Sequence, residues 1–418
     1  MIKILKMKTI VTVIILAGSL LAHSQDMLES YLVEAALNNP GLKGKFNEYQ
    51  ATLEKITQAG ALPDPQVNFG YFIQPVETRV GPQRARISAS QMFPWFGTLG
   101  AKEDAATEMA KSKYEVFQEA KSRLFYDVKT TWYNLYFTKK ATDITAENIT
   151  ILNTLRKLAL VKVESGLASA ADVLRVEMEI ADMENHLVFL KDNYHTLQVS
   201  FNNLLNVNAD RVVDIPDSLV NSDFDLSRKA ALDSIISRNH NIMQSEYSEA
   251  SYKKQEIVAR KQGNPGLMLG LDYVLVGKGQ GSMATVSGAG KDAVVFPMVG
   301  ITIPLYRKKY TSMVKEASLM QEAAENSKLD KINLIETTFE KANRDYSDAD
   351  RRILLYTEQS DKASKSLRII QTAYETDGKN FEEVLRMEQQ LLKYETELEK
   401  ALADKNASLA FINYLMGK

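Results

Sequence analysis

The 418-residue sequence contains no cysteine. Disulfides, thiolate metal ligands, a thiol nucleophile and an acylated N-terminal cysteine are therefore excluded, and no lipid anchor of the lipoprotein type is expected. Proline is also scarce, at 10 residues, whereas alanine, leucine, glutamate and lysine are abundant. This composition favours a mainly helical protein.

An excess of charge of one sign is also missing. The chain has 51 basic and 53 acidic residues, which gives a net charge of −2. Because acids and bases are interspersed, there is no basic field that would favour nucleic acid as a partner.

Long apolar runs are absent after the first 24 residues. Three lysines within the first eight residues precede an apolar run from Ile10 to Leu21, and the small residues Ala22 and Ser24 follow it. The run is shorter than the roughly 20 residues of a spanning helix, so residues 1–24 are predicted to be a cleaved signal peptide rather than an anchor. The mature chain is expected to be exported. If it enters a membrane, it must do so as a β-barrel or on the surface.

The rest of the chain is predicted to be an internal repeat, with one copy over residues 25–215 and the other over residues 216–418. Matching residues of the two copies are separated by roughly 200 to 212 positions. Both copies carry a coiled-coil seam in which apolar residues step alternately by three and four. The seam positions are Val173, Val176, Ile180, Met183, Leu187 and Leu190, and then Val384, Met387, Leu391, Tyr394, Leu398 and Ala401.

Each copy contains a pair of segments in which apolar and polar residues alternate, at about 66–93 and about 266–304. This alternation predicts two β-hairpins, each with one apolar and one polar face. Pro297 is expected to interrupt the fourth strand with a bulge or loop. Arg84, Arg86 and Asp272 fall on the polar face. They are predicted to line an aqueous lumen, with solvated charge beside a loop as the alternative.

Helical patterns flank the hairpins. The pattern at 98–163 would reach roughly 100 Å at about 1.5 Å per residue, and its return path is divided between helices at 26–60 and 172–208. The second copy repeats this with an outgoing helix at 305–375 and returning helices at 227–262 and 380–416.

Four strands cannot close a membrane barrel, because roughly eight is the smallest known number. Closure therefore requires several copies of the chain. Two copies would give eight strands and a barrel filled by its own side chains, and three would give twelve strands and room for water.

The helix turns at 164–172 and 376–380 are candidate docking sites for partners. Capping of the helix ends is the alternative interpretation, and both can hold together. The candidate docking residues are Glu164, Gly166, Asp172, Asp377, Gly378, Glu382 and Glu383, and the candidate strand-to-helix junction residues are Pro94, Trp95, Gly97 and Pro304.

Four segments together resemble the TolC family of outer-membrane efflux proteins: 61–68 before the first strand, 93–97 after the second, 166–174 at the first helix turn and 303–307 after the fourth strand. The resemblance covers the whole mature chain. It implies a homotrimer with a twelve-stranded barrel in the outer membrane, a twelve-helix periplasmic tunnel, and docking through a periplasmic adaptor to an inner-membrane pump.

Within that family, the chain is most similar to the heavy-metal and multidrug branch that works with resistance-nodulation-division pumps. Many members of this branch carry a lipidated N-terminal cysteine. This sequence has no cysteine, so the resemblance implies anchoring by the barrel alone.

No enzyme, cofactor or metal site is predicted. The four histidines, at positions 23, 186, 195 and 240, lack metal-ligand spacing, and no catalytic grouping or phosphate loop is present. The favoured function is a passive exit duct for drugs, metal cations, peptides or proteins. The alternative is an extracytoplasmic coiled-coil scaffold or adaptor without a pore.

Overall fold

The computed structural model describes residues 23–78, 81–221, 223–277, 293–377 and 381–418. The expected signal peptide, apart from its last two residues, and Gly378 of the second tip turn lie outside the described residues. The chain divides into two compact units. The helical unit comprises Met1–Lys43, Glu119–Ile236 and Leu334–Lys418, and the sheet unit comprises Gly44–Gln118 and Ser237–Asn333.

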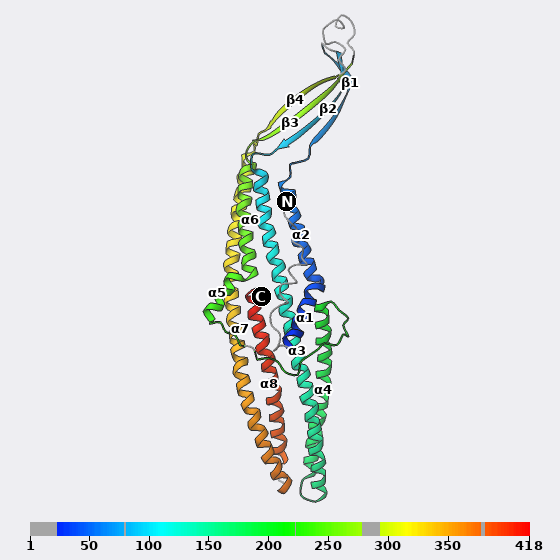
Figure 1. Cartoon of the computed structure of the whole chain (residues 1–418), viewed down its shortest axis with the longest axis vertical. Coiled ribbons are helices and arrows are strands. Elements are labelled where there is room, and N and C mark those ends of the chain that lie inside the picture. Colours follow the sequence, from blue (N-terminus) through cyan, green and yellow to red (C-terminus); the bar gives the residue numbers. More distant parts are fainter. Residues whose placement is uncertain (1–22, 79–80, 222, 278–292, 378–380) are drawn as a thin grey trace. The chain divides into compact units, whose positions relative to one another are not determined.

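Two helices, two strands, one long helix and one further helix follow one another, and this order then occurs a second time (Figure 1). The first set is α1 (His23–Asn38), α2 (Pro40–Gly60), β1 (Gln66–Thr78), β2 (Gly81–Phe93), α3 (Thr98–Glu164) and α4 (Ala170–Leu205). The second set is α5 (Arg228–Arg238), α6 (His240–Gln262), β3 (Gly266–Val276), β4 (Ala293–Thr302), α7 (Arg307–Asp377) and α8 (Phe381–Leu415).

Two of the expected helices are each divided by an asparagine, so the predictions of single helices at 26–60 and 227–262 are wrong. The Asn39 side chain accepts a hydrogen bond from the Leu42 amide at 3.0 Å, and Pro40 begins α2. Asn239 caps α6 in the same way by accepting from the Asn241 amide at 3.0 Å. An asparagine cap satisfies amides at a helix start, and proline is favoured at the first helical position, so a new helix begins at each site.

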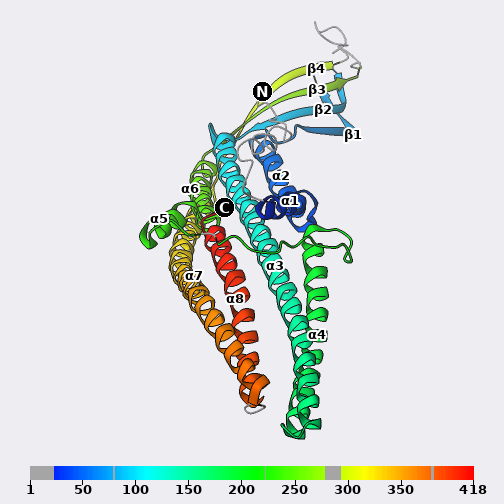
Figure 2. The ribbon, with the colours of Figure 1, turned by 60° about the horizontal axis from the view of Figure 1, so that its bottom comes forward.

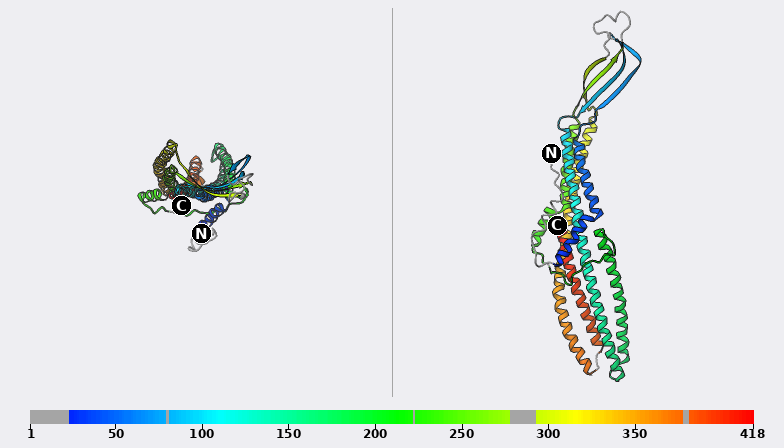
Figure 3. Two further views of the ribbon diagram at one scale, coloured as in Figure 1. Left: turned by 90° about the horizontal axis from the view of Figure 1, so that it is seen from above. Right: turned by 45° about the vertical axis from the view of Figure 1, so that its right-hand side comes forward.

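The four strands form one antiparallel sheet in the order β1-β2-β3-β4. They curve side by side in Figure 3. The expected interruption at Pro297 is not found, because β4 pairs with β3 without a register shift and Pro297 lies opposite Leu271. β4 is an edge strand, where a missing N–H is tolerated.

In the helical unit, α4 lies beside the C-terminal part of α3, and α8 lies beside the C-terminal part of α7 (Figure 2). Their core contains the N-terminal part of both seams. Val173, Val176 and Ile180 of α4 and Val384 and Leu385 of α8 are buried together with side chains of α3 and α7. Apolar burial along these stripes is the main stabilising contribution to such a helix arrangement.

Within the described part of the chain, no helix combines the length and the apolar character needed to cross a membrane.

Candidate functional site

The sheet has two chemically different faces, which follow from its register. Residues that pair across neighbouring strands point to the same side, so each row of partners belongs to one face. On one side the row Phe69, Ile87, Tyr273 and Val295 is apolar throughout. We call this side the apolar face; its large exposed side chains are Val67, Phe69, Tyr71, Ile87, Leu267, Leu269, Leu271, Tyr273, Leu275, Val295, Val299 and Ile301.

These side chains are exposed in the single chain, with Phe69 at 72% and Val299 at 71%. A contiguous apolar patch of this kind is rare on a soluble monomer and marks a surface that contacts lipid or another protein.

The opposite side, the polar face, has small and polar side chains such as Asn68, Ser88 and Ser90. It also contains Arg86 and Asp272, which form an ion pair. Asp272 is 0% exposed, so it lies beneath Arg86 and is not an open lining charge. Arg84 belongs to β2 at a shift in its register with β3, and its Nε is 2.7 Å from the position that a Cβ on Gly277, just after β3, would occupy.

Glycines on the polar face leave room for methionines from neighbouring strands. A Cβ on Gly300 would lie 2.7 Å from Cε of Met268, and one on Gly270 would lie 3.4 Å from Cε of Met298. The methionines therefore lie along the sheet. The sequence signal for this packing is one glycine on the polar face beside a methionine of the neighbouring strand, Gly270 in β3 and Gly300 in β4.

The candidate junction residues carry the chain from a strand into a long helix. Gly97 adopts φ of 72°, a left-handed conformation that favours glycine, and its carbonyl accepts from the Ala101 amide at 3.1 Å. Pro94 is half-buried, Trp95 packs edge-on against Phe96 with ring centroids 5.9 Å apart, and Pro304 is buried. Exposed aromatic rings stand at both junctions, Phe96 at 82% and Tyr306 at 83%. Such rings are typical of membrane interfaces.

The turn between α3 and α4 is a capped helix junction. Gly166 has φ of 70°, and Ser169 and Asp172 form a capping box at the start of α4. The capping interpretation of Asp172 is thus confirmed. Glu164 is exposed at the end of α3.

The start of α8 lies close to this turn. Glu382 and Glu383 lie in the first turn of α8, and Glu382 is 3.9 Å from the Arg175 guanidinium of α4. A cleft of about 460 Å³ is lined by Asp172, Arg175, Phe381, Glu382, Glu383 and Arg386. Asp377 is the last residue of α7. The structure therefore brings Asp172, Glu382 and Glu383 together.

A buried lysine links the two helix pairs near these turns. Lys162 Nζ of α3 donates to the backbone carbonyls of Tyr374 at 2.9 Å and Glu375 at 2.7 Å, both in the last turns of α7. A cation favours the C-terminal end of a helix, where the carbonyls lack helical partners. Lys162 is not among the residues predicted from the sequence, because a lone lysine near a helix end has no distinctive pattern.

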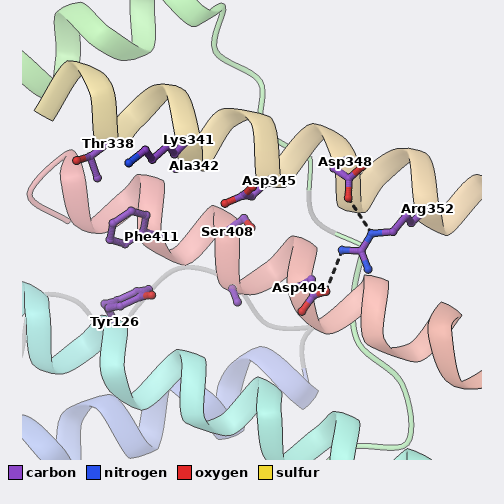
Figure 4. A pocket seen from close by; sticks show the side chains of 11 residues that line it. Tyr126, Thr338, Lys341, Ala342, Asp345, Asp348, Arg352, Asp404, Ser408 and Phe411 are labelled. Atoms are coloured by element: carbon purple, nitrogen blue, oxygen red, sulfur yellow. Dashed lines mark hydrogen bonds and ion pairs between the residues drawn. The ribbon is translucent and has the colours of Figure 1, made fainter. Parts of the chain in front are cut away.

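A second cleft of about 460 Å³ lies between α3, α7 and α8 (Figure 4). Arg352 of α7 bridges two carboxylates there, Asp348 at 3.0 Å and Asp404 of α8 at 2.9 Å. At the other end of this cleft, Tyr126 of α3 and Phe411 of α8 lie with ring centroids 5.1 Å apart.

Glu388 is a buried acid within the seam of α8. It is 2% exposed, its Oε1 lies 3.5 Å from the Asn148 amide nitrogen of α3, and its Oε2 has no hydrogen-bond partner among the described residues. Burial, with a further contribution from Glu395, raises the pKa of Glu388 to about 7.

In the described ranges, no group of three or more histidine, cysteine, aspartate or glutamate side chains is arranged to hold a metal ion.

No family model matches the sequence, and no curated protein is similar to it in sequence. Solved structures do match it. The outer-membrane channel OprN superposes with a TM-score of 0.76 at 16% identity, over 94% of this chain and 90% of OprN. The outer membrane protein VceC from Vibrio cholerae superposes at 0.78 with 14% identity, over 94% and 96% of the two chains. CusC, whose structures describe transmembrane channel formation, superposes at 0.77 with 15% identity, over 93% and 92%.

These solved structures are TolC-family outer-membrane channels. The present chain has their fold, so the resemblance drawn from the four sequence segments is confirmed at the level of the fold.

Proposed function

We propose that this chain, which has the fold of outer-membrane channels, is one protomer of a passive exit duct in the outer membrane. The duct would belong to a tripartite efflux or secretion system and would open when a periplasmic adaptor and an inner-membrane pump engage it. The single observation that carries the proposal is the sheet, which exposes a mainly apolar face and has two edge strands, β1 and β4.

Lipid is the partner that fits the apolar face, because nearly all of its side chains are apolar, with Gln91 opposite Leu269 as an exception, and aromatic rings lie at the junctions with the helices. The two edges need strand partners, since unpaired backbone groups are not tolerated in hydrocarbon. β1 and β4 run antiparallel in the four-stranded order, so β4 of one copy can pair with β1 of the next. Three copies close a twelve-stranded barrel that is wide enough to hold water.

The helices and their turns would form the periplasmic part of the duct. The docking surface proposed for the adaptor is built from Glu164, Gly166, Asp172, Asp377, Gly378, Glu382 and Glu383, and the wall of the lumen includes Arg84, Arg86 and Asp272. The signal peptide would direct export and be removed, and the barrel alone would anchor the protein. The duct would have no catalytic activity and no cofactor. Drugs, metal cations, peptides and proteins all remain candidate cargoes.

Single-channel conductance in a planar bilayer, combined with the mass of the purified protein in detergent, tests this function. We expect stable trimers and discrete conductance steps, small ones if the tip is closed at rest. Monomers that never insert would contradict the duct and leave the coiled-coil scaffold as the surviving alternative.

Strand pairing between copies has its own test, because the chain has no cysteine of its own. Asn68→Cys on β1 would be combined in turn with Phe296→Cys, Met298→Cys or Thr302→Cys on β4. Within one chain Asn68 is at least about 14 Å from each of these positions, because three strand spacings separate β1 from β4, and this is too far for a disulfide. We therefore expect oxidation to give covalent oligomers for one of the three pairs.

The matched control replaces Asn68→Cys by Val67→Cys, which lies on the apolar face. Because its side chain points away from the three polar-face positions, we expect no crosslink. Crosslinking of this control as strongly as the best Asn68 pair would contradict the proposed pairing.

A further inference from the structure

Arg86 lies flat across the polar face of the sheet. It belongs to β2, its Nη2 pairs with the Asp272 carboxylate of β3, and the same nitrogen is 3.7 Å from Met298 Sδ of β4. The guanidinium therefore lies over β3, where it meets the side chain of Met298, whose Cε is 3.4 Å from the position of a Cβ on Gly270. An arginine that extended into the open space above the sheet would make neither contact.

Asp272 is buried at the base of this arrangement. Its side chain is 0% exposed, and its second oxygen, Oδ1, has no hydrogen-bond partner within the described part of the chain. An ionised carboxylate in such a place is unfavourable unless a cation accompanies it. The Arg86 guanidinium supplies that cation, so the two side chains form one nearly neutral unit.

The space on the other side of Arg86 is open. Its partner on β1 is Gly70, and a Cβ placed there would meet only the Arg86 backbone carbonyl, at 4.0 Å. Asp272 and Met298 hold the guanidinium on one side, while on the β1 side its partner Gly70 has no side chain. An Arg86 released from Asp272 would therefore have room to move away from the sheet.

We propose that Asp272 is a positioning residue for Arg86 and thereby sets the charge preference of the duct. It holds the guanidinium against the wall and cancels its charge, so that permeating ions of both signs meet an almost uncharged surface at this level. Loss of the carboxylate frees a cationic side chain into the lumen, which favours anions and narrows the path. This inference rests on the proposed function.

The test is the reversal potential across a planar bilayer in a gradient of potassium chloride. Asp272→Asn removes one negative charge per copy, hence three in a trimer. We expect a roughly twofold rise in the chloride-to-potassium permeability ratio, because each uncovered charge acts on ions across about one Debye length of electrolyte. We also expect a lower unitary conductance, because the freed side chain occupies part of the lumen.

The double variant Arg86→Gln with Asp272→Asn is the matched control. It removes both charges together, so the net charge of the wall equals that of the wild type, and we expect the permeability ratio and the conductance to return to wild-type values. If Asp272→Asn does not assemble, Asp272→Ser, which is smaller and equally uncharged, takes its place.

Two results would overturn the inference: a wild-type permeability ratio in the Asp272 variants, or a double variant that keeps their altered ratio. Neither result affects the proposed function, because both are measured on working channels. Failure of the wild-type protein itself to form channels would contradict the proposed function instead.

Discussion

Replacing Glu388 with glutamine is expected to make the helical unit more stable at alkaline pH. The Glu388 side chain is buried between α8 and α3, and one of its oxygens lacks a partner among the described residues. Burial raises its pKa from an ordinary value of 4.5 to about 7. The folded state thus binds the Glu388 proton more tightly than the unfolded state does.

The direction of the pH effect follows from this difference. Below pH 4.5 the Glu388 carboxyl group is protonated in both the folded and the unfolded state, so its ionisation does not lower the stability. As pH rises from 4.5 to about 7, the unfolded state loses its proton first and the folded state becomes relatively less stable. Above pH 7 the buried carboxylate is ionised, and the folded state is destabilised by the full amount. The difference between a pKa of 4.5 and a pKa of about 7, at 1.36 kcal/mol per pKa unit, corresponds to about 3 kcal/mol in the free energy of unfolding.

Glutamine has the shape of the protonated acid and cannot ionise, so Glu388→Gln removes this penalty. We expect the free energy of unfolding to rise by up to about 3 kcal/mol near pH 8 and to change little near pH 4. The assay is thermal unfolding followed by helical circular dichroism at both pH values. Glu177→Gln, on the exposed side of α4, is the matched control and should have almost no effect at either pH. Equal melting temperatures for Glu388→Gln and the wild type near pH 8 would show that the carboxyl group is hydrated or paired in the folded protein.

Three further substitutions test other surfaces. Leu269→Arg places a charge on the apolar face and should destabilise membrane assembly by roughly 2 to 4 kcal/mol near the bilayer midplane. The yield of heat-resistant oligomer measures this loss, and Ser90→Arg on the polar face should still assemble. Equal yields for the two variants would contradict the assignment of the faces. Lys162→Met removes the donor to two carbonyls of α7 and should lower the stability of this contact by about 1 to 3 kcal/mol. Limited proteolysis should then cut the end of α7 faster than in the wild type. An unchanged rate would show that Lys162 does not hold the end of α7 in place. Lys405→Met removes the buried ammonium that donates to Asp350 and Asp223, and should lower the stability by about 1 to 3 kcal/mol because the two acids that remain are exposed to water. A calorimetric scan should therefore show a lower melting temperature, and an unchanged one would refute the network.

Local patterns predicted much of the architecture. The period of two in the strands assigned the apolar and polar faces, and the register of the sheet keeps Leu269 and Val299 on one side and Asp272 on the other. The heptad seam placed Val176 and Val384 in the core, where both are 0% exposed. These features depend on the spacing of side chains along a single element, which is present in the sequence itself.

Several local signals were available but unused. The Asn-Pro pair at residues 39–40 marks a helix boundary, and the division at Asn239 has the same asparagine cap without the proline. Gly270 of β3 and Gly300 of β4 signalled the methionine packing on the polar face.

The sequence by itself thus determined the types of element, their polarity and the turns that end them, because each follows from neighbouring residues. Only the tertiary structure decided which elements from the two halves meet. It pairs β2 with β3, brings Lys162 to the end of α7, buries Glu388 against Asn148 and joins Arg86 to Asp272. These contacts join residues far apart in the chain, and an isolated lysine, glutamate or arginine has no periodic pattern that identifies its partner. Such a partner is selected by packing and by the need to satisfy buried charge, both of which exist only in the folded protein.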